Sequence, residues 1–257
     1  MSAQSVAAPV RQLAAAQPLA WLARGWRDFL RAPLPSIVHG LAFVAGAAAI
    51  VAIGWGRFYL LAGAFSGFLL VAPMLVAGLY EASRMLARDE QPTMRDVLRV
   101  WIDGGACMVR LGLLLALLGT VWVGLSTLII VGLGGGTGAG IEDFMRHFVL
   151  SPNWIPFALW LVAGGLFAAI VFAIAAVSVP MLLDRDVNLP VAALTSVRVV
   201  GANPVAMTIW AGLVMLVTLF GLALVLPMIV LVPVLGHATW HAYADSVDAG
   251  ALAPRML

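Results

Sequence analysis

Six long apolar segments, separated by short polar stretches, constrain this chain more than any other feature. They cover residues 36–55, 60–83, 106–133, 154–183, 204–222 and 224–243. Each is close to or longer than the roughly 20 apolar residues that an α-helix needs to cross a bilayer. Only 10% of the residues are charged, against about 25% in a typical soluble domain. The sequence therefore predicts an all-α polytopic membrane bundle of six transmembrane helices.

The predicted bundle forms one domain over residues 18–247, with an N-terminal tail, 1–17, and a C-terminal tail, 248–257. The N-terminal tail is rich in Ala and Gln and is interrupted by Arg11. It lacks the apolar core of a signal peptide, and we expect it to be disordered. The single cysteine, Cys107, excludes an intrachain disulfide, and a net charge of +2 gives no strongly basic surface for nucleic acid.

All 14 basic residues are arginines, and they are unevenly distributed. Only Arg57 and Arg146 fall in the loops after the first and third segments. Eleven others lie before the first segment, after the second, after the fourth or near the C-terminus: Arg11, Arg24, Arg27, Arg31, Arg84, Arg88, Arg95, Arg99, Arg185, Arg198 and Arg255. Because cytoplasmic loops are enriched in Lys and Arg, this pattern places both termini in the cytoplasm.

Short amphipathic stretches precede the first, third and fifth segments, at 18–31, 93–101 and 189–200. In the first, Trp21, Leu22, Trp26, Phe29 and Leu30 share one helical face, and Arg24, Arg27, Asp28 and Arg31 share the other. This pattern indicates helices that lie in the membrane interface, with Arg27, Arg99 and Arg198 as interfacial arginines. Thr93 and Asn188 are candidate N-caps.

The stretches divide the chain into three similar units, each with an interfacial helix, a span, an outer turn and a returning span. Each returning span contains a proline, at Pro73, Pro180 or Pro233. The sequence therefore predicts three hairpin-like units, as in membrane proteins built from internal repeats, many of which are transporters.

Polar residues recur near the cytoplasmic ends of the returning spans. They form a candidate polar cluster of Glu81, Arg84, Asp184, Arg185 and Asp186. We expect interfacial ion pairs here rather than a proton relay, because no acidic residue falls at the middle of a predicted span.

Three histidines lie at comparable depth: His39 in the first segment, and His237 and His241 in the last. His237 and His241 are four residues apart and share a helical face. Three imidazoles could bind copper or zinc, and a haem would need His39 with one of the other two. The alternative, which the position near the helix end favours, is a polar packing cluster.

No motif predicts catalysis or a nucleotide. The glycine-rich segment 132–140 follows a membrane helix rather than a strand, and the chain has no Lys for a phosphate-binding loop. No nucleophile motif and no HExxH are present. We expect no enzyme, no firm cofactor and a short outer surface helix over 141–150.

Four blocks carry a resemblance to a known family: Trp26-Arg27-Asp28-Phe29, Leu79-Tyr80-Glu81, Leu182-Leu183-Asp184-Arg185-Asp186 and Leu235-Gly236-His237-Ala238-Thr239-Trp240-His241. Over residues 20–247 the chain resembles the bacterial integral membrane family called domain of unknown function 2189. Some members carry a cytochrome c oxidase subunit label, which implies an inner-membrane location and a respiratory connection. This chain lacks the six-histidine pattern of a haem–copper catalytic subunit.

Three functions remain open from the sequence. The first is a non-catalytic accessory, assembly or scaffold component of a larger membrane complex, with a membrane-protein partner or a second copy of the chain. The second is a transporter or channel for a small solute or ion, motivated by the repeat. The third is a copper, zinc or haem handler that uses the histidines.

Overall fold

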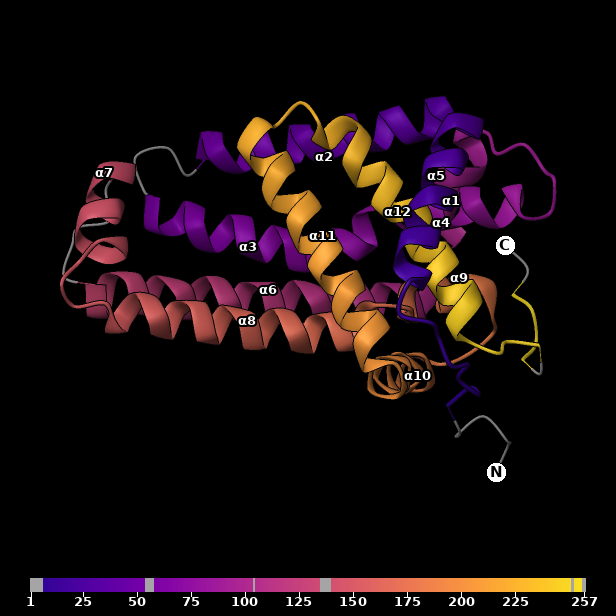
Figure 1. The fold of residues 1–257 in the computed structure, drawn as a ribbon. Helices are drawn as coiled ribbons and strands as arrows, with labels where there is room; N and C mark the ends of the chain where they lie inside the picture. The colour runs from indigo at the N-terminus through magenta and orange to yellow at the C-terminus, as the bar shows by residue number, and fades with distance from the viewer. Residues whose placement is uncertain (1–6, 54–57, 104, 135–139, 251, 256–257) are drawn as a thin grey trace. The chain divides into compact units, whose positions relative to one another are not determined.

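The computed structural model describes all residues except 1–6, 54–57, 104, 135–139, 251 and 256–257 (Figure 1). The described residues contain helices and no β-strand, apart from isolated bridges between Val10 and Val247 and between Arg185 and Pro254. The elements are α1 (Gln17–Arg31), α2 (Pro33–Ile53), α3 (Phe58–Leu75), α4 (Ala77–Leu86), α5 (Met94–Asp103), α6 (Gly105–Gly134), α7 (Ile141–Phe144), the π-helix η1 (Met145–Val149), α8 (Ile155–Ala175), α9 (Ser178–Asp184), α10 (Leu189–Ala202), α11 (Pro204–Leu224) and α12 (Met228–Ser246). The predicted all-α class is confirmed.

Several of these helices suit a membrane. Pro33–Ile53, Gly105–Gly134 and Ile155–Asp184 are long and apolar enough to span a bilayer, and a fourth span results if α10 and α11, bent by 105°, count as one. Many large apolar side chains on α2, α6, α8 and α11 are exposed, as expected for lipid-facing helices. The described residues therefore give three or four candidate spans, and neither the predicted count of six nor the hairpin arrangement is established.

The predicted returning spans differ from one another in the structure. The segment 60–83 is divided into α3 and α4 at Val76, three residues after Pro73. The segment 154–183 is divided at residues 176–177, ahead of Pro180, whereas α12 continues through Pro233. Proline removes a backbone hydrogen bond, and the neighbouring helices decide whether a break results.

The chain divides into two compact units. Unit 1 comprises Met1–Val44, Pro73–Leu111 and Phe172–Leu257, and unit 2 comprises Ala45–Ala72 and Gly112–Val171. Four helices, α2, α3, α6 and α8, contain residues of both units. Unit 2 lies entirely within the domain predicted over residues 18–247, whereas unit 1 also includes the two predicted tails.

Unit 2 has an aromatic core on the facing sides of α6 and α8. Ile129, Ile130 and Phe148 are buried there against Phe157 and Trp160. The Trp160 indole N–H donates to the Ser126 hydroxyl at 2.7 Å. Phe148 belongs to η1, so the short helix predicted over 141–150 is confirmed and is anchored by this ring.

The N-terminal segment corrects one expectation. The sequence predicted a disordered tail over residues 1–17, but the described residues 7–16 pack against α10 and α12. The Ala8 N–H donates to the Thr195 hydroxyl at 3.0 Å, and the Arg11 N–H donates to the Ser246 carbonyl at 2.8 Å. The Asn203 side chain accepts from the Leu13 N–H and donates to the Arg11 carbonyl. These partners lie far away in the sequence, so local composition gave no sign of them.

The three amphipathic stretches are helices, as predicted. Asn188 caps α10 by accepting from the Val191 N–H at 3.0 Å, which confirms its predicted role. At the joints α1–α2 and α10–α11, the residues before proline have nearly the same backbone angles: φ −126°, ψ 61° at Ala32 and φ −127°, ψ 53° at Asn203. A following proline disfavours the helical region, so both joints bend for the same reason.

Helix α12 is the element around which unit 1 packs, and it contacts α1, α4, α9 and α11. Glycines allow the closest approaches. A Cβ atom at Gly25 of α1 would lie 2.6 Å from the Val234 carbonyl oxygen, and one at Gly40 of α2 would lie 2.1 Å from that of Ile229. In both cases the obstacle is backbone, which cannot rotate away.

We therefore expect Gly25→Ala to destabilise the protein by about 1–3 kcal/mol, the usual cost of overpacking. Thermal unfolding in mild detergent measures the change. Gly212→Ala in α11 is the matched control, because a Cβ atom added there would meet nothing within 4 Å. Equal melting temperatures for the two variants would contradict the close α1–α12 packing.

Candidate functional site

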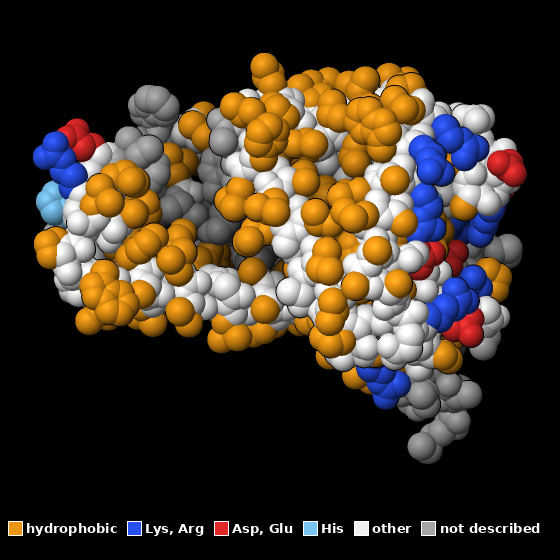
Figure 2. Space-filling view, in the orientation of Figure 1, with side chains coloured by type: hydrophobic (Ala, Val, Ile, Leu, Met, Phe, Trp, Pro, Cys, Tyr) orange, Lys and Arg blue, Asp and Glu red, His pale blue; other side chains and the backbone are white. Residues whose placement is uncertain are grey.

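The charged side chains of unit 1 mark the candidate site. All eleven arginines that the sequence assigned to the cytoplasmic side lie in unit 1. Figure 2 shows Arg and acidic side chains gathered over α1, α4, α5 and α9. Two features lie within this region: a buried hydrogen-bond network on α12 and an arginine-lined pocket beside it.

His237 lies at the centre of the buried network and is 0% exposed. Its Nε2 is 3.0 Å from Ser36 Oγ on α2, and its Nδ1 is 2.8 Å from Ser83 Oγ on α4. The Ser83 hydroxyl donates to Asp28 Oδ2 of α1 at 2.7 Å, and the same oxygen lies 2.8 Å from His241 Nε2. Five side chains thus join four helices through consecutive hydrogen bonds.

The directions of the hydrogen bonds made by Ser83 and Ser36 determine which protonation state of His237 fits. The Ser83 hydroxyl donates to Asp28, so its oxygen accepts from the His237 Nδ1–H. The Ser36 hydroxyl has two acceptors in reach, the Ala32 carbonyl at 2.6 Å and His237 Nε2 at 3.0 Å. A neutral His237 fits when Ser36 donates to Nε2, and a protonated His237 fits when Ser36 donates to Ala32.

Two carboxylates, Asp28 of the network and Asp245 near the end of α12, are held in their charged form. Burial alone would raise the pKa of Asp28, but hydrogen bonds from His241 and Ser83 outweigh it and lower the pKa below its usual range. Burial likewise opposes a low pKa at Asp245, which hydrogen bonds from Arg24, Gln17 and Trp21 lower. The Trp21 indole N–H, for example, donates to Asp245 Oδ2 at 2.8 Å. Both carboxylates tie α1 to α12.

The three candidate metal-binding histidines have different surroundings. His237 and His241 contact Ser36, Ser83 and Asp28, whereas His39 Nδ1 lies 2.9 Å from the Pro35 carbonyl of its own helix. Among the described residues, no three His, Cys, Asp or Glu side chains are placed to hold one metal ion. His237 and His241 belong to the hydrogen-bond network described above, and His39 is not one of its five side chains.

The candidate polar cluster forms two ion pairs, Glu81 with Arg84 and Asp184 with Arg185. Arg84 Nε and Nη2 donate to the two Glu81 oxygens at 2.7 and 2.8 Å, with both side chains below 10% exposure. Arg185 Nε and the Tyr243 hydroxyl each donate to Asp184 Oδ2 at 2.8 Å. Asp186 is exposed, and its backbone N–H donates to the Ala253 carbonyl at 3.0 Å.

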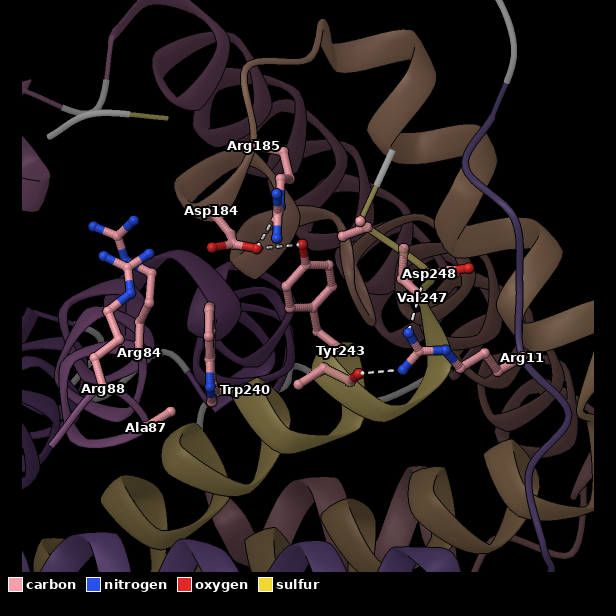
Figure 3. A pocket seen from close by; sticks show the side chains of 13 residues that line it. Arg11, Arg84, Ala87, Arg88, Asp184, Arg185, Trp240, Tyr243, Val247 and Asp248 are labelled. Atoms are coloured by element: carbon pink, nitrogen blue, oxygen red, sulfur yellow. Dashed lines mark hydrogen bonds and ion pairs between the residues drawn. The ribbon is translucent and has the colours of Figure 1, made fainter. Parts of the chain in front are cut away.

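A pocket of about 400 Å³ opens beside this cluster (Figure 3). Arg84 and Arg88 contribute to one side, and Trp240 and Tyr243 of α12 contribute aromatic rings. Its charged lining residues are Arg11, Arg84, Arg88, Asp184, Arg185 and Asp248. A second cavity of about 220 Å³ shares Arg84 and Arg88, and its other charged lining residues are Glu81, Glu90, Asp96 and Arg99.

The other predicted interfacial arginines, Arg27 and Arg198, are exposed, as is Arg99. The sequence interpretation missed four residues of this site, three of them in the network and the fourth Asp245. Asp28 was assigned to the polar outer face of its helix but is 6% exposed, which corrects that assignment. Ser36 and Ser83 gave no signal. Asp245 could have been found, because it continues the four-residue spacing of His237 and His241.

Long helices with exposed apolar side chains, together with the arginines gathered in unit 1, are typical of an integral membrane protein with helical spans. Residues 60–184 match the model of the family described as "Predicted integral membrane protein (DUF2189)". This is the family that the sequence motifs predicted, and the match includes the block at Leu79 and the first three residues of the block at Leu182; the blocks at Trp26 and His237 lie outside it. No curated protein matches the chain, and no solved structure does either.

Loss of one partner of the buried Glu81–Arg84 pair should be costly. We expect Glu81→Ala to destabilise the protein by about 3–5 kcal/mol, because it leaves a buried guanidinium uncompensated. The double variant Glu81→Met/Arg84→Met should recover much of that loss. Thermal unfolding in detergent measures both.

The control for this pair is Glu142→Ala, which breaks the Glu142–Arg146 pair. Its side chains are 77% and 72% exposed, so the cost should stay below about 1 kcal/mol. A loss at Glu81 no larger than that at Glu142 would contradict the buried pair.

The lowered pKa of Asp28 predicts a stability that depends on pH. A carboxyl group with a depressed folded-state pKa contributes stability above its unfolded pKa of about 3.9 and loses it as pH falls through the folded value. The wild-type melting temperature should therefore fall as the pH drops below about 5. Asp28→Asn should flatten this dependence, and Ser83→Ala should flatten it less. Identical slopes for wild type and Asp28→Asn would refute the role of Asp28.

Proposed function

We propose that this protein is a non-catalytic accessory, assembly or scaffold component of a larger complex in the bacterial inner membrane. The observation that best supports this proposal is the hydrogen-bond network around His237. Its polar groups are buried and use their hydrogen-bonding capacity on one another. Such a network fixes the arrangement of helices, and it presents no reactive group to a substrate.

The apolar surface supports contact with other membrane helices as well as with lipid. In unit 2, a Cβ atom added at Gly124 of α6 or Gly165 of α8 would meet nothing within 4 Å. By contrast, the neighbouring Gly164 is covered by Trp122. Small residues on open faces let another helix approach closely, which suits a partner protein or a second copy of this chain.

The arginines support the proposed orientation. Unit 1 contains all eleven arginines that the sequence assigned to the cytoplasmic side, and the positive-inside rule assigns such a region to the cytoplasm. Both described chain ends belong to unit 1, so both termini are proposed to be cytoplasmic.

The transport alternative needs a polar path along the spans. The two cavities of unit 1 are lined by arginines, acidic residues and residues of α12, and by no residue of α2, α6 or α11. These cavities therefore do not favour transport. The metal alternative has no three-ligand cluster among the described residues to favour it.

Purification from native membranes tests the proposal. We expect protein tagged at its native expression level and extracted in mild detergent to co-purify with a stoichiometric membrane complex, identified by mass spectrometry. Gly165 lies on an open face of α8, where a partner helix could approach closely. Gly165→Leu should therefore reduce the recovery of the complex without lowering the melting temperature of the protein. The control is Leu161→Ala, which changes another exposed residue of α8.

Migration of the wild-type protein alone would refute the accessory role. Metal analysis of the same sample tests the third function: near-equimolar copper, zinc or iron that is lost in His237→Ala/His241→Ala would replace the proposal.

A further inference from the structure

One of the four arginines that line the pocket, Arg88, forms no ion pair with any residue that the structure describes. Three of its four arginines are paired: Arg84 with Glu81, Arg185 with Asp184, and Arg11 with Asp248. Arg88 makes no ion pair and no side-chain hydrogen bond within the part of the chain that the structure describes. The pocket is therefore suited to an anion.

The guanidinium group of Arg84 lies beside that of Arg88 (Figure 3). Arg88 is an exposed residue in the turn that follows α4, four residues after Arg84, and Figure 3 shows the two guanidinium groups together at one side of the pocket. Glu81 occupies Nε and Nη2 of Arg84, while Nη1 has only a long contact, 3.4 Å, to the Arg255 carbonyl. The free fork of Arg88 and Nη1 of Arg84 thus offer several donors from two cations.

We propose that this pocket binds a phosphate group. Guanidinium forks match phosphate oxygens in geometry and charge. The volume of about 400 Å³ falls within the range of about 300–1,000 Å³ for small-molecule sites. Two sources of phosphate share this chemistry, an anionic phospholipid headgroup and free phosphate.

The lining favours the lipid source. Trp240 and Tyr243 face the pocket beside the arginines, and both residue types are enriched where membrane proteins meet headgroups. A phosphodiester headgroup such as that of phosphatidylglycerol carries a single negative charge, which balances the single unpaired arginine.

Native mass spectrometry of the full chain in neutral detergent tests the site. The probes are phosphatidylglycerol, diacylglycerol with the same acyl chains, and inorganic phosphate. We expect one phosphatidylglycerol per protein, bound in preference to diacylglycerol and weakened by salt. Arg88→Gln should weaken this binding about tenfold or more, since a hydrogen bond to a charged group contributes about 1.5–3 kcal/mol.

Two further variants keep the test specific. Arg88→Lys retains the charge and should bind more tightly than Arg88→Gln. Arg198→Gln removes an exposed arginine that does not line the pocket and should leave binding unchanged. Competition by inorganic phosphate alone, with the same sensitivity to Arg88→Gln, would identify free phosphate as the source. Equal binding by wild type and a folded Arg88→Gln protein, or equal binding of diacylglycerol, would overturn the proposal.

Discussion

Polar residues at four-residue spacing on α12 hold unit 1 together. His237, His241 and Asp245 occupy one helical stripe because residues four apart on an α-helix are neighbours. A polar group removed from water is costly unless it forms hydrogen bonds. Each of the three meets this requirement through another helix: His237 through α2 and α4, and the others through α1. The stripe therefore fixes which helices surround α12.

The pocket depends on the same contacts. Ser83 holds α4 against Asp28 and His237, and the next turn of the chain carries Arg84 and Arg88. On α12, Tyr243 orients Asp184, which in turn engages Arg185. Arg84, the residue after Ser83, is thus positioned next to a network that does not line the pocket, whereas Arg185 is held by Asp184 and Tyr243, which do. A change in the network would alter the pocket without touching it.

The sequence predicted those features that depend on nearby residues. Amphipathic periodicity predicted α1, α5 and α10, and the spacing of Glu81 and Arg84 predicted their pair. The inward face of Asp28 was missed, because its partners Ser83 and His241 lie 55 and 213 residues away. The apolar helices α2, α6 and α8 have no polar face to indicate their orientation, so their packing and the division into two units could not be predicted either.

The contacts also bear on the extent of the structural unit. The family match covers residues 60–184 and so includes Ser83 and Asp184. Their buried partners lie outside it, since Ser83 bonds Asp28 and His237 while Asp184 accepts from Tyr243. Residues 60–184 alone would leave these polar groups without those partners, at a cost of about 1–3 kcal/mol each. In this chain the folding unit therefore extends beyond the matched segment in both directions, to α1 and to α12.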